Sequence, residues 1–247
     1  MKYSFLIPYC NRAIHFSLCS VAYTHHYHNR QDYEIIIIED RKNFDDPQNH
    51  SDLLNIIQDS KLPIKHIISE YNYFNPAYSF NLGAQHAQGE YFIITNPEIF
   101  HRVNILNGLD IEFEKNPNAY VVCSCQNVHA LTNSISHITE MIVAESCWYQ
   151  HSQHSNRLLH FCSAISRDNY KKIDGFSEEY NEGIAYEDDD FRHKILSEKT
   201  IEIVVQDDLC TFHLDHDRSY LHQNPELVGK NRAIFHEKWG PAKYTRD

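Results

Sequence analysis

Four short apolar segments in the first hundred residues constrain the fold more than any other feature of the sequence. They are residues 5–7, 35–38, 64–68 and 91–94. Segments this short and this apolar are typical of strands buried on both faces, as in a parallel sheet. The stretches between them have helical spacing, at residues 13–26, 51–58 and 77–86. This alternation predicts a doubly wound α/β domain.

The second half of the chain is less regular. Strands are predicted at residues 119–124, 161–165, 200–205 and 209–212, and helices at 104–114 and 225–239. Residues 132–156 are polar and rich in His and Ser, which predicts a loop. No linker-like composition separates the halves, so we expect one domain over residues 1–247, with a mixed, mostly parallel sheet flanked by helices.

Charge and cysteine content limit the partners and the compartment. The 34 acidic and 22 basic residues give a net charge of −12, which argues against nucleic acid or an anionic membrane surface as the main partner. The apolar opening ends at Pro8, and no apolar stretch approaches the ~20 residues of a membrane span, so we expect neither a signal peptide nor a transmembrane helix. Seven cysteines without paired spacing predict reduced thiols in a cytoplasmic protein.

Acidic residues follow two of the predicted strands. Glu39 and Asp40 come directly after residues 35–38, and Glu98 follows Asn96-Pro97 after residues 91–94. Ligands of such sheets bind at the carboxyl ends of the strands, where a carboxylate can reach a ribose hydroxyl or a metal ion. At each position a simple turn is the competing interpretation.

Two further groups stand in the second half of the chain. Residues 187–190 are Glu-Asp-Asp-Asp at the start of a predicted helix, and His213 and His216 follow a predicted strand. Carboxylates in a first helical turn interact well with the helix dipole, but four in a row repel one another, which raises a pKa and favours a general base. Closely spaced imidazoles suit a divalent ion. With 18 histidines in the chain, two surface histidines that are close by chance are an equally good interpretation.

Taken in order, these segments resemble the glycosyltransferases of GT-A family 2. Residues 5–12 (FLIPYCNR) resemble the opening strand and turn of that family, and residues 37–40 (IIED) stand at its V-D-D nucleotide motif. Asn81-Leu-Gly83 and Ala87-Gln-Gly89 precede a strand as in the family's N-x-G and A-x-G segments. The C-terminal segments 172–178 (KIDGFSE), 187–190 (EDDD) and 211–216 (TFHLDH) are similar to those of its galactosyltransferase-like branch.

The resemblance implies a GT-A fold, with a nucleotide-binding half at residues 1–100 and an acceptor-binding half at 101–247. It also implies an inverting hexosyl- or N-acetylhexosaminyl-transferase of polysaccharide or other glycan synthesis. The donor would be a nucleotide-diphosphate sugar, most often of UDP, and the acceptor a glycan or glycolipid, with peripheral membrane association left open.

The same resemblance assigns roles to individual residues. Asp188 stands at the general base, and Glu187 beside it holds the acceptor. The nucleotide would be bound by Pro8, Tyr9, Arg12, Glu39, Asp40, Asn81 and Asn96. A single Mn²⁺ or Mg²⁺ would be held by Glu98, His213 and His216.

One departure from the family pattern is Asn96-Pro97-Glu98, which stands where the family has D-x-D. The last carboxylate is kept as Glu98, but the first is an amide. Two alternatives therefore remain open: a metal-free enzyme in which Arg or Lys neutralises the diphosphate, and an inactive sugar-nucleotide-binding or scaffold protein of the same fold. A metal-dependent phosphoesterase is a third alternative, which no motif supports.

Overall fold

The computed structural model describes residues 1–73, 75–128 and 147–241. Its strands are β1 (Tyr3–Tyr9), β2 (Tyr33–Glu39), β3 (Ile64–Ile68), β4 (Tyr91–Thr95), β5 (Ile99–His101), β6 (Ala119–Val128), β7 (Cys147–Gln150), β8 (Cys162–Ser166) and β9 (Glu202–Leu214). Its helices are α1 (Ala13–Tyr27), α2 (Arg41–Phe44), α3 (Pro47–Ser60), α4 (Ala77–His86), α5 (Ile105–Lys115), α7 (Arg167–Lys172), α8 (Glu187–Ser197), α9 (Ser219–Gln223) and α10 (Pro225–Trp239), with a 3₁₀ turn, η1 (Glu178–Tyr180).

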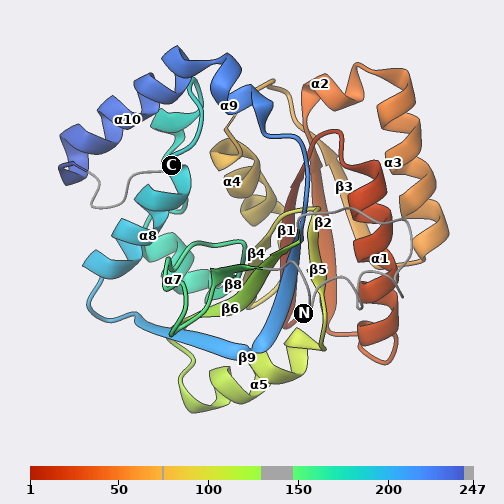
Figure 1. Cartoon of the computed structure of the whole chain (residues 1–247). Helices are drawn as coiled ribbons and strands as arrows, with labels where there is room; N and C mark the ends of the chain where they lie inside the picture. Colours follow the sequence, from red (N-terminus) through yellow and green to blue (C-terminus); the bar gives the residue numbers. More distant parts are fainter. Residues whose placement is uncertain (74, 129–146, 242–247) are drawn as a thin grey trace.

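All of these strands belong to one mixed sheet in the order β3-β2-β1-β4-β8-β6-β9-β5, with β7 paired to β6. The first four strands of this order are parallel, and β8 joins β4 and β6 in antiparallel pairing. Figure 1 shows α1 and α3 on one side of the molecule and α8 and α10 on the other. The predicted α/β fold with a mostly parallel sheet is confirmed.

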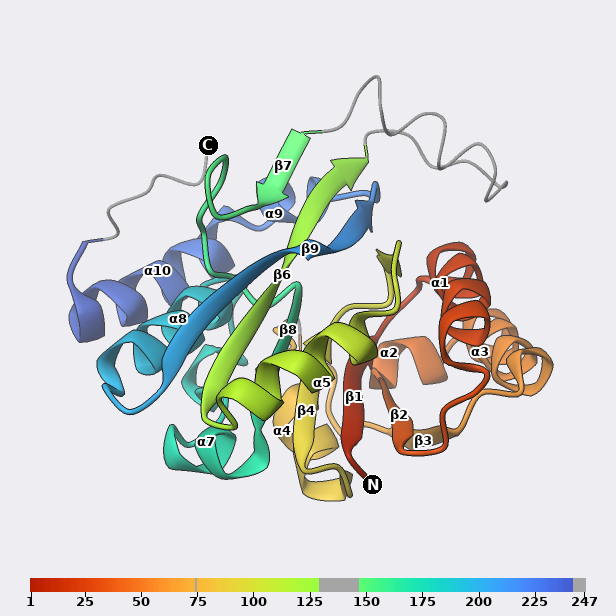
Figure 2. The same ribbon diagram turned by 90° about the horizontal axis from the view of Figure 1, so that it is seen from below.

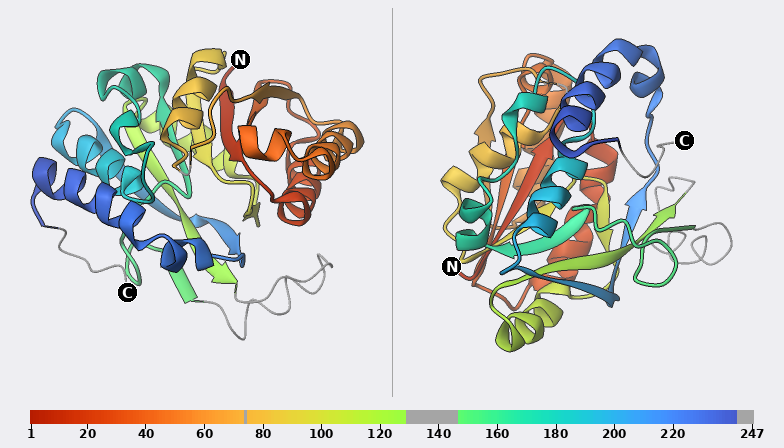
Figure 3. Two further views of the ribbon diagram at one scale, coloured as in Figure 1. Left: turned by 90° about the horizontal axis from the view of Figure 1, so that it is seen from above. Right: turned by 90° about the vertical axis from the view of Figure 1, so that its left-hand side faces the viewer.

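Helices cover both faces of the sheet. One apolar core packs α1, α3 and α5 against one face, and a second core packs α4, α7 and α8 against the other. The four isoleucines 35–38 are fully buried and are shared between the two cores, which is why this segment is apolar at consecutive positions. Figure 3 shows the two helical layers with the sheet between them.

The last third of the sheet differs from the sequence prediction. Residues 202–214 form one long strand, β9, where two strands were expected (Figure 2). The register shifts between the pairs Cys123–Gln206 and Cys125–Thr211, which accommodates residues 207–210 of β9, and Ser124 donates a hydrogen bond to the Asp207 carbonyl there. Residues 147–150 form β7 where a loop was expected, whereas residues 151–156 form a turn closed by an isolated bridge between His151 and Ser155. Residues 132–146 of that predicted loop lie outside the described part of the chain.

Several residues of the family-like motifs hold the fold together. A Cβ atom on Gly89 would lie 2.5 Å from the backbone nitrogen of Ser4, so only glycine fits there. The side chain of Asn81 bonds to the backbone of Phe176 and to the Tyr170 hydroxyl, which joins α4 to the turn after α7. That turn contains Gly175 with φ +48°, a conformation that favours glycine. Among the described residues, no helix is long and apolar enough to cross a membrane.

Candidate active site

Strand pairing brings Glu98, His213 and His216 together at one edge of the sheet. Glu98 directly precedes β5, and His213 lies near the end of β9. The two strands pair antiparallel with Ile99 opposite His213, and the backbone nitrogen of Leu214 donates to the carbonyl of Glu98 at 3.0 Å. His216 follows two residues after the end of β9. The three side chains that the sequence analysis assigned to a metal therefore lie side by side.

The three side chains form a compact donor set. Oε1 of Glu98 lies 3.8 Å from Nε2 of His213 and 3.7 Å from Nε2 of His216, and the three ligand atoms lie within 4.8 Å of one another. Glu98 and His213 are only 6% and 3% exposed. Metal bonds of ~2.1 Å place two ligands of one ion at about such separations.

The protonation states of the cluster suit a cation. Burial lowers the pKa of His216 to about 4, with Arg12 adding to the effect, and burial likewise lowers the pKa of His213 well below its usual range. Both imidazoles are therefore neutral at pH 7, the state in which they bind metal. Burial raises the pKa of Glu98, while the positive charges of Arg12 and Arg218 oppose that rise. One carboxylate and two neutral imidazoles fit Mn²⁺ or another divalent ion of similar softness.

Two arginines border this donor set. Nε of Arg12 lies 3.7 Å from Oε2 of Glu98, and its Nη2 lies 3.1 Å from Nδ1 of His216. Nη2 of Arg218 lies 3.1 Å from Nδ1 of His213. The edge of the sheet thus offers a metal-ligand set and two guanidinium groups, an arrangement that can neutralise an anion such as a diphosphate.

The acidic block of residues 187–190 begins α8 and has two parts. Oε2 of Glu187 accepts a hydrogen bond from the amide of Asn75 at 2.7 Å, and Oδ1 of Asp188 accepts one from the backbone nitrogen of Asp189 at 2.8 Å. Burial raises the pKa of Tyr220 in α9, and the charges of both Glu187 and Glu98 raise it further. Tyr220 therefore lies within electrostatic range of both carboxylates.

The other part of the block serves the structure. Asp190 is fully buried and accepts hydrogen bonds from Ser177 and from the indole of Trp239, and it pairs with Lys238 at 2.9 Å. Burial alone would raise its pKa, but these partners lower it below the usual range. The expectation that crowding raises the pKa is therefore wrong for Asp190, because its charge is compensated from α10. Asp189 pairs with Arg192 one turn further along α8.

The residues predicted to bind the nucleotide have different surroundings. Pro8, Tyr9, Arg12, Glu39, Asp40 and Asn96 lie at the carboxyl ends of β1, β2 and β4, whereas Asn81 lies in α4 against the turn at Phe176. The Glu39 carboxylate is fully buried and accepts hydrogen bonds from Asn43, His50 and His66 at 2.6 to 3.0 Å. Asp40 is partly exposed and caps α2 through the backbone nitrogen of Lys42.

Three tyrosines form a partly exposed cluster after β3. The rings of Tyr71 and Tyr73 stack at 5.2 Å, and the ring of Tyr78 stands across both at 5.1 and 5.7 Å. Tyr71 is 46% exposed. Tyr71 and Tyr73 lie in the same connection as Asn75, which bonds to Glu187, and Tyr78 lies in the first turn of α4 that follows.

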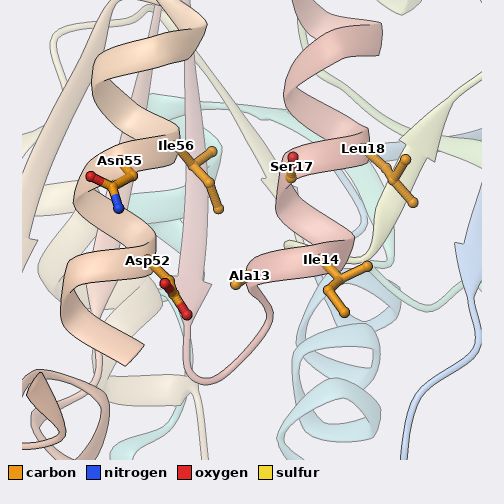
Figure 4. Close-up of a pocket in the computed structure, with 7 residues that line it drawn as sticks. All are labelled: Ala13, Ile14, Ser17, Leu18, Asp52, Asn55 and Ile56. Atoms are coloured by element: carbon orange, nitrogen blue, oxygen red, sulfur yellow. The ribbon is translucent and has the colours of Figure 1, made fainter. Parts of the chain in front are cut away.

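A separate groove of about 450 Å³ lies between α1 and α3 (Figure 4). Its lining residues are Ala13, Ile14, Ser17, Leu18, Asp52, Asn55 and Ile56. None of the predicted site residues lines this groove. The chemistry-bearing groups are concentrated at the Glu98 cluster instead.

Sequence reasoning missed four residues of this region: Asn75, Arg218, Tyr220 and Asn127, whose Oδ1 lies 2.9 Å from Nδ1 of His213. Arg218 stands two residues after His216, and this proximity in sequence was the only feature that could have indicated its place in the site. The other three come from elements that meet the site through tertiary packing, so no local pattern marks them.

Comparison with known proteins gives a family and a fold. The model of glycosyl transferase family 2 matches residues 4–174. No curated protein matches the sequence at a significant level.

Solved glycosyltransferase structures resemble the whole chain at low identity. S. aureus TarS 1–349 is 15% identical with a TM-score of 0.67, over 99% of this chain and 67% of that one. A longer TarS structure is 14% identical with a TM-score of 0.66, and the match covers only 41% of it. The mannosyltransferase PcManGT from Pyrobaculum calidifontis, solved with GDP-Man and Mn²⁺, is 12% identical with a TM-score of 0.64, over 96% of this chain and 64% of that one. At these identities the likeness concerns the fold alone.

Proposed function

This chain belongs to glycosyl transferase family 2, and from that premise we propose that it moves a sugar from a nucleotide-diphosphate donor to a hydroxyl of a glycan or glycolipid acceptor, with inversion. The observation that carries the proposal is the Glu98–His213–His216 donor set bordered by Arg12 and Arg218, together with Glu187, which Asn75 holds at the start of α8. These are the groups that a diphosphate leaving group and an acceptor hydroxyl require.

Departure of the nucleoside diphosphate develops negative charge at the sheet edge. The guanidinium groups of Arg12 and Arg218 lie against the donor set, so they can hold the diphosphate oxygens. A divalent ion held by Glu98, His213 and His216 would supply further charge neutralisation to the leaving group. The solved PcManGT complex with GDP-Man and Mn²⁺ supports this part by analogy.

Proton removal from the acceptor is assigned to Asp188. Inverting transfer requires a carboxylate that takes the proton of the attacking hydroxyl on the face opposite the diphosphate. Asp188 stands in the first turn of α8, where the helix dipole stabilises its charged form. Glu187, which is oriented by Asn75, would hold the acceptor in place.

The donor is proposed to carry UDP with a hexosyl or N-acetylhexosaminyl group. TarS structures with UDP and with UDP-GlcNAc support this choice by analogy. The two oxygens of Glu39 are engaged by Asn43, His50 and His66, which favours Asp40 over Glu39 as the contact to the nucleoside. Seven free thiols support the cytoplasm as the compartment.

The tyrosine cluster is proposed as the acceptor surface. Exposed aromatic rings pack well against the C–H faces of sugars, because the ring face is electron-rich. Burial raises the pKa of Tyr73 and of Tyr78, and nearby carboxylates raise both further. These are Glu178 and Glu182 for Tyr73, and Glu70 and Glu178 for Tyr78. An acidic border of this kind favours a neutral or amino-sugar glycan over an anionic one.

A second candidate is an inactive sugar-nucleotide-binding protein, which the amide Asn96 in place of a carboxylate favours. Heat-stability measurements with a panel of nucleotide sugars, with and without Mn²⁺, followed by transfer assays, separate the two. A donor at 100 times its Kd stabilises a protein by about 2.7 kcal/mol, or roughly 5–10 °C for a chain of this size. Stabilisation without turnover would indicate the inactive protein, and no stabilisation by any nucleotide sugar would contradict both.

A further inference from the structure

Asn127 of β6 lies directly opposite His213 of β9. The two residues are register partners in the parallel pairing of these strands, and Oδ1 of Asn127 lies 2.9 Å from Nδ1 of His213. The opposite ring nitrogen, Nε2, faces Oε1 of Glu98 at 3.8 Å, which is too long for a hydrogen bond. One side of the imidazole therefore has a hydrogen-bond partner, and the other side faces the donor set.

The proton on His213 can occupy either ring nitrogen, and only one choice suits a metal. A neutral imidazole carries one N–H, and the nitrogen that binds metal must be the other one. An amide oxygen accepts hydrogen bonds and cannot donate them, so Asn127 stabilises the tautomer with the proton on Nδ1. The lone pair of Nε2 then points toward Glu98.

Arg218 could favour the opposite tautomer. Its Nη2 lies 3.1 Å from Nδ1 of His213 and could donate to it, which would move the proton to Nε2. However, the same Nη2 lies 3.4 Å from Oδ1 of Asn127, so the oxygen can accept from Arg218 and His213 together. The contact of Asn127 with the ring, at 2.9 Å, is also shorter than the contact of Arg218 with the ring. In the Nδ1–H tautomer, His213 and Arg218 both donate to Oδ1 of Asn127, so all three side chains have a hydrogen bond.

We propose that Asn127 is a positioning residue, which holds His213 in the Nδ1–H tautomer and so directs Nε2 into the Glu98–His213–His216 metal site. This role rests on the proposed function in so far as that function uses a metal. Among the described residues, His216 has no side-chain acceptor of this kind: its Nδ1 lies 3.1 Å from the backbone carbonyl of Asp217 and 3.1 Å from Nη2 of Arg12, which is a donor. Substitution of Asn127 can therefore alter the orientation of His213 without changing a metal ligand or removing a positive charge from the site.

The tautomer can be observed directly. Long-range ¹H–¹⁵N correlation spectra of the metal-free protein distinguish protonated from unprotonated ring nitrogens, and the His213→Gln spectrum assigns the signal. We expect Nδ1–H in the wild type and in Asn127→Asp, and a shift toward Nε2–H in Asn127→Leu, which keeps the volume and removes the acceptor. A wild-type ring protonated at Nε2 would overturn the proposal.

Mn²⁺ titration followed by electron paramagnetic resonance of the free ion gives a second measurement that does not depend on activity. Loss of a partner that orients a metal ligand typically weakens the metal 10- to 100-fold, and we expect this for Asn127→Leu. Asn127→Asp should remain within about threefold of the wild type, as should Asn156→Leu at an exposed position outside the cluster.

The possible failures can be told apart. An unchanged tautomer and Mn²⁺ affinity in a folded Asn127→Leu protein would overturn the role of Asn127. A wild type that binds no Mn²⁺ would remove the metal site and this role with it. Mn²⁺ binding that depends on Asn127, in a protein that transfers no sugar, would support the role and contradict the proposed function alone.

Discussion

The amide of Asn75 donates a hydrogen bond to the carboxylate of Glu187 at 2.7 Å, so the connection before α4 is joined to the first residue of α8. The same amide lies 3.3 Å from the carbonyl of Ala185, which precedes α8. Two segments more than a hundred residues apart in sequence thus share one polar contact beside the tyrosine cluster. Substitutions around this contact should separate acceptor binding, proton transfer and folding.

Replacing Asp188 by Asn should abolish transfer while leaving nucleotide binding nearly unchanged. The amide keeps the shape of the side chain but cannot take the proton, and the loss of general-base catalysis lowers the rate ~10²–10⁴-fold. Transfer assays and UDP calorimetry on the purified variant measure the two effects. Asp189→Asn is the matched control and should stay within about threefold of wild type. Wild-type turnover in Asp188→Asn would remove this residue from the mechanism.

Replacing Asp190 by Asn should reduce stability instead. Asp190 is buried against Ser177, Trp239 and Lys238, and removing the charge leaves Lys238 without its buried partner. We expect a loss of about 2–4 kcal/mol in the free energy of unfolding, measured in urea. Asp189→Asn, which weakens the pair with Arg192 one turn further along α8, should lose less than about 1 kcal/mol. Equal losses in the two variants would contradict the assignment of Asp190 to the structure.

Tyr71 should contribute to acceptor binding through its ring. Tyr71→Ala should raise the KM for the acceptor about 5- to 10-fold, which corresponds to roughly 1 kcal/mol of lost stacking. Tyr71→Phe keeps the ring and should restore the wild-type value, and UDP affinity should be unchanged in both. A KM that does not change in Tyr71→Ala would place the acceptor elsewhere.

Glu98 should be required for metal binding. Glu98→Ala removes the only carboxylate of the donor set and should weaken Mn²⁺ about 100-fold or more, and Mn²⁺ should be preferred over Mg²⁺ because two ligands are imidazoles. Glu90→Ala, at an exposed position, serves as the control. Activity that survives EDTA, together with sugar transfer by Glu98→Ala, would favour neutralisation by Arg12 and Arg218.

Acid should destabilise the protein through its buried histidines. His101 is fully buried, its Nδ1 lies 2.7 Å from the Tyr27 hydroxyl, and burial lowers its pKa to about 3. In the unfolded chain the pKa of a histidine is ~6.5, so between pH 6.5 and about 3 only the unfolded chain binds this proton. The free energy of unfolding therefore has its full value above pH 6.5 and decreases as the pH falls below it.

Each such histidine should lower the free energy of unfolding by about 1.4 kcal/mol per pH unit, and His216 should add a second contribution. Urea unfolding at pH 7, 6 and 5 measures the slope. His101→Gln should reduce this slope by about 1.4 kcal/mol per pH unit, which corresponds to one proton fewer bound on unfolding. An unchanged slope would show that His101 is not the group that titrates.

The sequence predicted those parts of the site that lie next to strand ends. Glu98 and His213 stand beside buried strands, so the expectation that they gather at one sheet edge followed from topology, and the structure brings them together. Asn127 could not be found in this way, because its place opposite His213 depends on the register of β6 and β9. The continuity of β9 could not be predicted either, because the strand runs through residues 207–210 by means of a register shift against β6.

Two residues of the family-like motifs have structural partners that the sequence did not reveal. Asn81 and Glu39 were predicted to bind the nucleotide, and the structure shows each with a full set of partners within the protein. A polar residue at a motif position can hold two segments together as readily as it can bind a ligand. Their contact with a nucleotide stays a prediction.

The pairing of β5 with β9 has a consequence for how the protein matures. The metal-ligand set joins Glu98 to a histidine more than a hundred residues later, so it requires closure of a long loop, and contacts of this range form slowly. During synthesis the parallel strands β1 to β4 emerge and can pair before β9 leaves the ribosome. A nascent or truncated chain can therefore assemble the first half of the sheet while it still lacks both imidazoles, and competence for metal should arise only after His213 and His216 have emerged.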